Sequence, residues 1–195
     1  MMPWTMRNPY RGQVRRWVGA GGSLSTRLAG AGQRFNVQVL HQGRQSLQPG
    51  EARVLGLSAS RSGYAREVVL RVDGVAVVFA RSVTAHAQSQ GPWRSIRGLG
   101  SRPLADLLFK RCAGIGRTPL TFAKLAPASQ ARRRVARAWQ FATGEALAPR
   151  ALPARRSVFQ RRGAPLLVME VFAAPCAPWC WPCACRPART DWISQ

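Results

Sequence analysis

The chain has 195 residues and carries 30 basic but only seven acidic side chains, a formal net charge of +23. Hydrophobic residues make up 46% of the chain, a share that excludes disorder throughout. This length is typical of one domain with its own core. The basic balance first suggests a nucleic-acid partner. All but two of the basic residues are arginine, however, and they are scattered through every segment, a bias that coding composition alone can also produce.

The N-terminal residues are basic but lack the apolar segment of a signal peptide. No apolar run in the chain is long enough for a transmembrane helix. Together these observations predict a cytoplasmic protein without a membrane span.

A short helix is predicted over residues 23–32, with Ser23 as its cap and Gly30 or Gly32 as its end. Residues 35–40 alternate apolar and polar side chains, which is typical of a strand with one buried face. Residues 43–52 are rich in turn formers, and residues 53–57 predict a weak strand.

The strongest local pattern lies in residues 64–83, where two β-branched runs flank Asp73-Gly74, a dipeptide suited to a two-residue hairpin turn. Counting outward from that turn places Arg66 opposite Arg81 on one apolar face, with Glu67 on the other, wetter face. Like charges directly opposite each other destabilise a sheet. Either both arginines reach past the strand ends into water, or the pair binds an anion, because a guanidinium suits carboxylates.

Two short helical segments follow around Gly98–Gly100 and predict a helical hairpin that can cover a sheet. Residues 129–144 predict a helix that ends at Gly144, with its arginines in water. Residues 155–172 predict a second β-hairpin, which turns near residues 161–163. The order of elements predicts an α+β fold: an antiparallel β-sheet with helices on one side and a helical-hairpin lid over an enclosed ligand pocket.

Glu170 stands in the middle of the apolar run APLLVMEVF, residues 164–172. Period-2 alternation gives this strand two apolar faces, so neither looks like a water face. Burying an unpartnered carboxylate costs several kcal/mol. Glu170 therefore either faces water from a half-exposed strand, has a buried partner, or lines a pocket.

Four of the five cysteines lie at the C-terminus, at Cys176, Cys180, Cys183 and Cys185. Thiolates can bind zinc, but zinc sites usually pair two short clusters across a folded loop. The preferred interpretation is a single domain over residues 1–175, followed by a disordered tail over residues 176–195.

Four segments together resemble the chorismate pyruvate-lyase family. REVVLRVDGVAVVFARSV resembles its sheet core, LGSRPLADLLF its lid, RRSVFQRRGAPLLVMEVF its closing hairpin, and GSLSTRL its first helix. The resemblance covers roughly residues 17–175. It implies a cytoplasmic lyase that eliminates pyruvate from chorismate and leaves 4-hydroxybenzoate for ubiquinone synthesis. It also implies that no metal or cofactor is needed, and we expect a monomer without a nucleic-acid partner.

The resemblance also implies roles for individual residues. Arg66 matches the arginine that binds the ring carboxylate, and Glu170 matches the glutamate at the ring hydroxyl; these two are the expected catalytic residues. The main-chain amides of Leu24 and Leu104 help to hold the carboxylate, and Arg81 matches a second arginine of the site. Chorismate carries two carboxylates, so the two arginines are expected to meet one or both. Whether Glu170 takes the C4 proton or only orients the substrate stays open.

The chain departs from the family pattern in two places. Met169 stands where threonine is common, directly beside Glu170, and the tail from Cys176 onward matches nothing in the family. Two other functions compete with the lyase. A non-catalytic module of related fold that binds aromatic acids would need a separate DNA-binding domain, for which we expect no room. A basic nucleic-acid binder predicts clustered surface arginines and leaves Glu170 unexplained.

Overall fold

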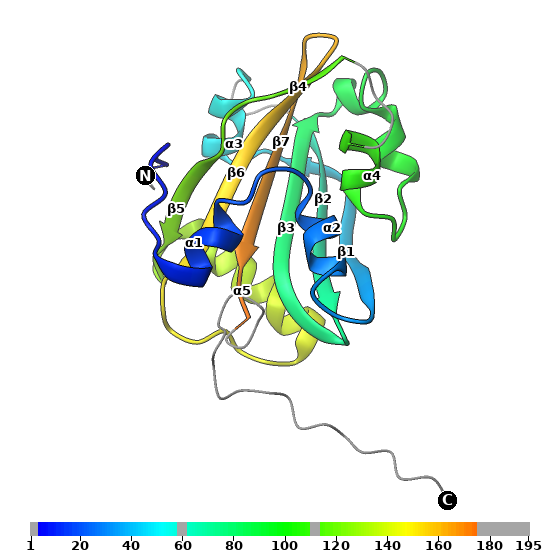
Figure 1. The fold of residues 1–195 in the computed structure, drawn as a ribbon. Helices are drawn as coiled ribbons and strands as arrows, with labels where there is room; N and C mark the ends of the chain where they lie inside the picture. The colour runs from blue at the N-terminus through cyan, green and yellow to red at the C-terminus, as the bar shows by residue number, and fades with distance from the viewer. Residues whose placement is uncertain (1–3, 58–61, 110–113, 175–195) are drawn as a thin grey trace, which may run out of the picture.

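A computed structural model describes residues 4–57, 62–109 and 114–174 of the chain. Within them seven strands form one sheet in the order β1-β2-β3-β7-β6-β4, with β5 paired to β6 (Figure 1). Every pairing is antiparallel, which confirms the predicted α+β class. The strands are β1 (Phe35–Ser46), β2 (Ser62–Val72), β3 (Val75–Ala85), β4 (Ile115–Arg117), β5 (Thr121–Leu125), β6 (Leu152–Arg161) and β7 (Ala164–Phe172).

Helices cover both faces of this sheet, so the prediction that they lie on one side is wrong. The front face, defined here as the one that carries Arg66, Ser82 and Glu170, is covered by α1 (Gly12–Val18), α2 (Leu24–Ala29), α4 (Leu104–Phe109) and the 3-10 helix η2 (Arg94–Gly98) (Figure 1). The 3-10 helix η1 (Ala87–Ser89) follows β3. The rear face is covered by α3 (Pro49–Val54) and α5 (Gln130–Thr143). A sheet that is apolar on both faces must bury both, and nearly every residue of β2 is buried.

The β2–β3 hairpin turns where the sequence predicts, at Asp73 (φ 50°) and Gly74 (φ 80°), and Val72 pairs with Val75. A β-bulge then shifts the register, because Arg71 pairs with Ala76 whereas Leu70 pairs with Val78. The bulge leaves one extra residue on β3, so the face of every side chain beyond it changes.

This bulge overturns the predicted arginine pair. Arg66 pairs with Ser82, and Arg81 pairs with Glu67. Because neighbouring side chains on a strand point to opposite faces, the guanidinium of Arg66 belongs to the front face and that of Arg81 to the rear face. The prediction that the two arginines are neighbours on one face is therefore wrong.

On the rear face Arg81 forms the centre of a buried charge network. Its side chain is 1% exposed, and its Nε and Nη1 lie 2.6 Å from Glu51 Oε1 and 2.8 Å from Glu67 Oε1. Arg134 of α5 also pairs with Glu67, at 3.1 Å. Glu67 is thus buried, not on a wetter face as predicted, and the network ties α3 and α5 to the sheet.

The segment that follows β1 also differs from its prediction. Strand β1 extends to Ser46, six residues beyond the predicted end, and a helix occupies the place of the predicted turns and weak strand. Pro49 opens α3, a position where proline's fixed φ suits a helix. Glu51 caps it by accepting a hydrogen bond from the main-chain N–H of Gln48 at 2.9 Å. Pro-Gly at residues 49–50 is typical of a turn in sequence. The Glu51 cap and the burial of Ala52 stabilise a helix there instead.

Other local predictions are confirmed. Ser23 Oγ accepts a hydrogen bond from Thr26 N–H at 3.0 Å and caps α2. Helix α5 ends at Gly144, which has φ of 75°. The closing hairpin turns at Arg162 and Gly163, both with positive φ.

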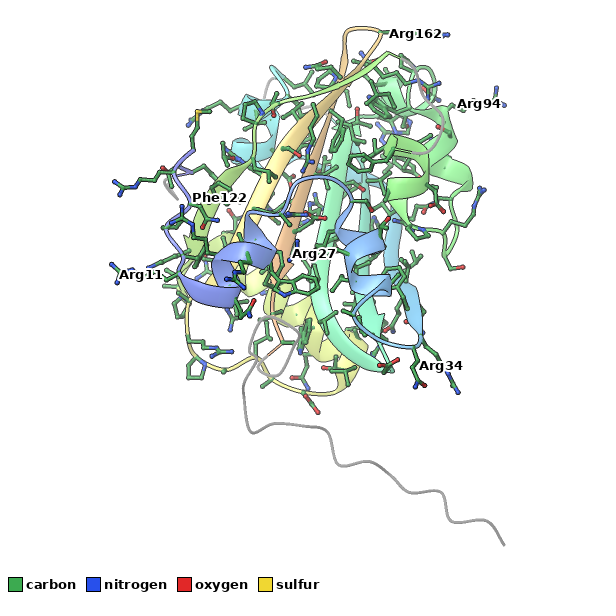
Figure 2. All side chains as sticks on the ribbon, in the orientation of Figure 1. Arg11, Arg27, Arg34, Arg94, Phe122 and Arg162 are labelled. Carbon is green, nitrogen blue, oxygen red and sulfur yellow. The ribbon has the colours of Figure 1, made fainter. Side chains whose placement is uncertain are left out.

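The charge run predicts that the arginines of α5 lie in water, but only some of them do. Arg133 and Arg137 are exposed, whereas Arg132 is buried and Arg134 pairs with Glu67. Elsewhere Arg11, Arg34, Arg94 and Arg162 project outward from different edges of the molecule (Figure 2). These four therefore do not form one stripe.

No helix in the described ranges combines the length and the apolar character that crossing a membrane would require. The four C-terminal cysteines and the predicted tail lie outside the described residues.

Replacing Arg81 with methionine should lower the free energy of unfolding by roughly 3–5 kcal/mol, because removing one partner leaves buried carboxylates unpaired. Urea titration of the purified variant measures this loss. Arg133→Met, which removes the same charge from an exposed site on α5, serves as the control and should change stability by less than about 0.5 kcal/mol. Equal stability of the two variants would show that the network contributes nothing.

Candidate active site

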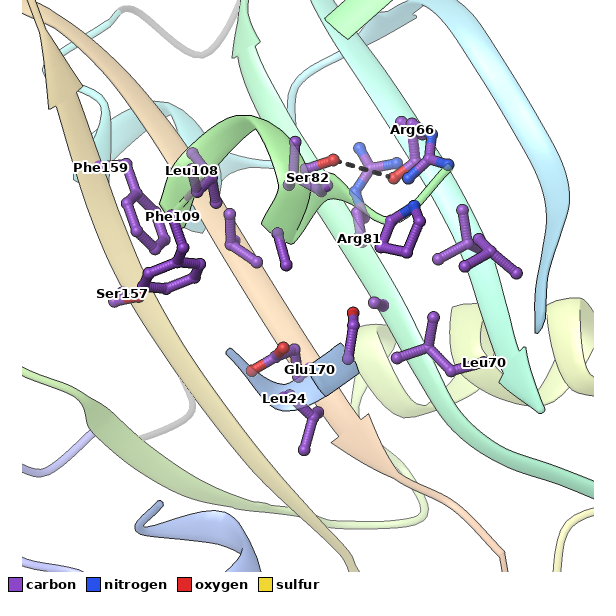
Figure 3. Close-up of a pocket in the computed structure, with 18 of the residues that line it drawn as sticks. Leu24, Arg66, Leu70, Arg81, Ser82, Leu108, Phe109, Ser157, Phe159 and Glu170 are labelled. Carbon is purple, nitrogen blue, oxygen red and sulfur yellow. Dashed lines mark hydrogen bonds between the residues drawn. The ribbon is translucent and has the colours of Figure 1, made fainter. Parts of the chain in front are cut away.

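A cavity lies between the front face of the sheet, the start of α2 and the length of α4 (Figure 3). Strands β2, β3, β7, β6 and β4 all contribute to its wall. Its free volume is about 50 Å³, which is room for a few water molecules. Its polar groups are those of a few arginines, serines and one glutamate, set among leucine, valine and phenylalanine side chains.

Arg66, on β2, is a buried cation that faces this cavity with 3% of its surface exposed. Its Nε donates to Gln42 Oε1 at 3.2 Å, and its Nη2 donates to the carbonyl oxygens of Gly100 at 2.8 Å and Arg102 at 3.0 Å. Its Nη1 makes no hydrogen bond, and no carboxylate pairs with it, within the described part of the chain. Burial lowers the pKa of this guanidinium, because the charged form loses hydration. An anion in the cavity would stabilise that charged form.

Glu170, on β7, has a buried partner and also lines the cavity, as two of the three alternatives for it suggest. Arg155, directly opposite it on β6, lies with its Nε 2.5 Å from Glu170 Oε2. Arg155 is 1% exposed, and its Nη1 donates to the carbonyl oxygens of Val18 at 3.2 Å and Ala20 at 2.7 Å. The ion pair fixes the carboxylate at the middle of the cavity wall.

Arg117, the last residue of β4, supplies a further guanidinium to the cavity. Its Nε donates to Ser157 Oγ at 3.1 Å, and its Nη1 donates to the carbonyl oxygen of Gly22 at 3.4 Å. Burial lowers its pKa, the charge of Arg155 lowers it further, and Glu170 partly offsets both effects.

Leu24 and Leu104 both line the cavity, and each is the first residue of a short helix. The first main-chain N–H groups of a helix have no acceptor within that helix. Arg81 borders the same cavity, but its guanidinium is held by Glu51 and Glu67 on the rear face.

The charges in the cavity wall favour an anionic ligand. Arg66, Arg117 and Arg155 contribute three positive charges, and Glu170 contributes one negative charge. The excess of two positive charges matches a small dianion. Within the described residues no group of three or more His, Cys, Asp or Glu side chains lies together in a way that could hold a metal ion.

The sequence interpretation missed Arg117 and Arg155. Arg155 could have been found, because counting outward from the turn at Arg162-Gly163 places it opposite Glu170. Arg117 gives no such signal, since it lies on a strand of three residues whose pairing with β6 follows a long connection.

Known proteins are similar to this chain along most of its length. Residues 8–179 match the model of the chorismate lyase family. A probable chorismate pyruvate-lyase of Albidiferax ferrireducens is 70% identical over 181 residues, which cover 93% of this chain and 91% of the relative. Another from Azoarcus sp. is 43% identical and covers 87% of this chain and 89% of the relative.

Solved structures show a similar fold at low sequence identity. PhnF from Mycobacterium smegmatis has a TM-score of 0.53 at 17% identity, covering 80% of this chain and 65% of that one. The C-terminal domain of the histidine utilization repressor from Pseudomonas syringae pv. tomato has a TM-score of 0.52 at 10% identity, covering 72% and 92%. These likenesses concern the fold alone. The family is shown by the sequence matches along nearly the whole chain: this protein belongs to the chorismate lyase family.

Proposed function

We propose that this protein eliminates pyruvate from chorismate and leaves 4-hydroxybenzoate, and that the reaction takes place in the cavity of Arg66 and Glu170. The observation that carries the proposal is the state of Arg66. It is a buried guanidinium without a carboxylate partner in the described part of the chain, and it faces the cavity that also holds Glu170. Membership of the family indicates the reaction, and Arg66 and Glu170 are the groups that would recognise the substrate.

The two groups suit the two ends of the product ring. In chorismate and in 4-hydroxybenzoate the ring carboxylate and the hydroxyl stand para to each other. Arg66 binds the carboxylate through its Nη1, which makes no hydrogen bond to the described residues. Glu170, held by Arg155, accepts a hydrogen bond from the hydroxyl. The first main-chain amides of α2 and α4, at Leu24 and Leu104, add donors for the carboxylate.

The reaction breaks the ether bond at C3 and removes the proton at C4. The electrons of the C3–O bond leave with the enolate of pyruvate, which takes up a proton, and the ring becomes aromatic. Aromatisation supplies the driving force, so the protein has to orient a dianion and exclude water. Glu170 lies at the C4 hydroxyl in this arrangement and fixes the reacting conformer.

Helix α4 and the loop before it form the lid of the cavity in this proposal. Four residues of α4, Leu104, Ala105, Leu108 and Phe109, line the cavity. Arg66 donates to the carbonyl oxygens of Gly100 and Arg102 in the loop that leads into α4. The arginine that binds the carboxylate therefore also holds the lid.

The test of the function is to mix purified protein with chorismate and to quantify both products. Equal amounts of 4-hydroxybenzoate and pyruvate, formed in proportion to protein, are expected. Tight binding of 4-hydroxybenzoate with no turnover of chorismate would instead identify a non-catalytic aromatic-acid binder.

Glu170→Gln should lower kcat by about 10²–10³-fold, because one positioned group in a water-excluded site is weakened. The amide oxygen can still accept from Arg155, so the free energy of unfolding should fall by less than it does in Glu170→Ala. Glu170→Ala should in addition lower the free energy of unfolding by roughly 3 kcal/mol, because Arg155 loses its buried partner. Parent-like turnover by the glutamine variant, measured by steady-state kinetics, would make Glu170 a structural residue only.

Arg66→Gln should weaken the binding of both chorismate and 4-hydroxybenzoate, because both carry the ring carboxylate. Loss of a buried charged contact of this kind corresponds to roughly 2–5 kcal/mol, or at least about 30-fold in KM and in the inhibition constant of the product. Arg133→Gln controls for net charge. An unchanged inhibition constant for 4-hydroxybenzoate would exclude Arg66 from the carboxylate site.

A further inference from the structure

We propose that Arg117 binds the second carboxylate of the substrate, the one on the enolpyruvyl side chain, and so makes the site select a dianion over the monoanionic product. The inference rests on the proposed function and assigns a role to a residue outside the pair that recognises the ring.

Arg117 is placed firmly but has no anionic partner among the described residues. Ser157 and Gly22 accept from its Nε and Nη1, whereas its Nη2 makes no hydrogen bond within that part of the chain. Its guanidinium carbon lies 5.2 Å from the ring centroid of Phe159 and 5.8 Å from that of Phe109. Aromatic rings stabilise a cation without neutralising it, so a half-buried positive charge stays available to a ligand.

Arg66 and Arg117 come from opposite sides of the cavity. Strands β2 and β4 are four steps apart in the sheet order, roughly 19 Å at the usual strand spacing, and Glu170 stands on β7 between them. Figure 3 shows Arg66 on one side of Glu170 and the rings of Phe109 and Phe159, against which Arg117 lies, on the other.

The chemistry of the substrate places its second carboxylate near Arg117. The enolpyruvyl ether stands on C3, next to the C4 hydroxyl and away from the ring carboxylate. With the ring carboxylate at Arg66 and the hydroxyl at Glu170, the side chain has to lie beside Glu170, at the end of the cavity opposite Arg66. Among the described residues, two cations stand there, Arg117 and Arg155.

Of these two, Arg117 is the one with capacity for a ligand. Arg155 already binds Glu170 and two carbonyl oxygens. Arg81, which the sequence favours as the second arginine, is neutralised on the rear face by Glu51 and Glu67. A carboxylate at Arg117 would bring the count of charges at the site close to balance.

The test compares two ligands that differ in this one carboxylate. Arg117→Gln should raise KM for chorismate by roughly 10- to 100-fold, the loss expected for a charged hydrogen bond, and should leave the inhibition constant of 4-hydroxybenzoate within about twofold. Arg66→Gln should raise both. Arg133→Gln, which removes the same charge from the exposed face of α5, should raise neither.

Arg117→Lys keeps the charge but loses the planar fork, and should show a smaller rise in KM than the glutamine variant. If Arg117→Gln unfolds at a lower urea concentration than the parent, Arg117→Lys is used in its place for the comparison of the two ligands. The assignment would be overturned if Arg117→Gln weakened the binding of chorismate and of 4-hydroxybenzoate equally, or if it changed neither. If the parent binds chorismate without turnover, the proposed function fails, and calorimetric binding of the same two ligands still decides the role of Arg117.

Discussion

The ion pair between Arg155 and Glu170 is the contact on which the cavity depends. It joins β6 to β7 across the middle of the sheet, and through the carbonyl oxygens of Val18 and Ala20 it also ties down the end of α1. A carboxylate would otherwise be costly in so apolar a strand. The pair holds Glu170 in one position, and its other oxygen accepts no hydrogen bond from the described residues.

Few acidic residues are present, so their positions decide which arginines are free to bind a ligand. Among the described residues, the three glutamates Glu51, Glu67 and Glu170 take part in buried or half-buried ion pairs. Two of these three lie on the rear face, where they neutralise Arg81. Among the described residues that line the cavity on the front face, Glu170 stands with three guanidiniums, those of Arg66, Arg117 and Arg155, and pairs with that of Arg155. The rear face of the sheet thus carries an arginine in a structural ion-pair network, and the front face carries the arginines proposed to bind the ligand.

Much of this arrangement follows from local sequence rules. Both hairpin turns, the caps of α2 and α5 and the α+β class all rest on short-range patterns that the structure confirms. The cover of the rear face by α3 and α5 was missed, although apolar residues on both faces of β7 pointed to it. The bulge near Val77 was missed because the register was counted outward from Asp73-Gly74 as an uninterrupted hairpin. Arg117 was missed because long-range pairing alone brings β4 beside β6.

The bulge in β3 has a consequence for how residue roles are transferred between relatives. One extra residue near Val77 determines which face every later side chain of β3 occupies, so Arg81 belongs to the rear network only because of that residue. In a relative whose hairpin lacked the bulge, an arginine at the same aligned position would point into the cavity and stand beside Arg66. Chemical identity in an alignment is therefore insufficient evidence of a shared role in this hairpin. Strand register has to be compared first, and an insertion or deletion of a single residue here can convert a structural arginine into a ligand-binding one.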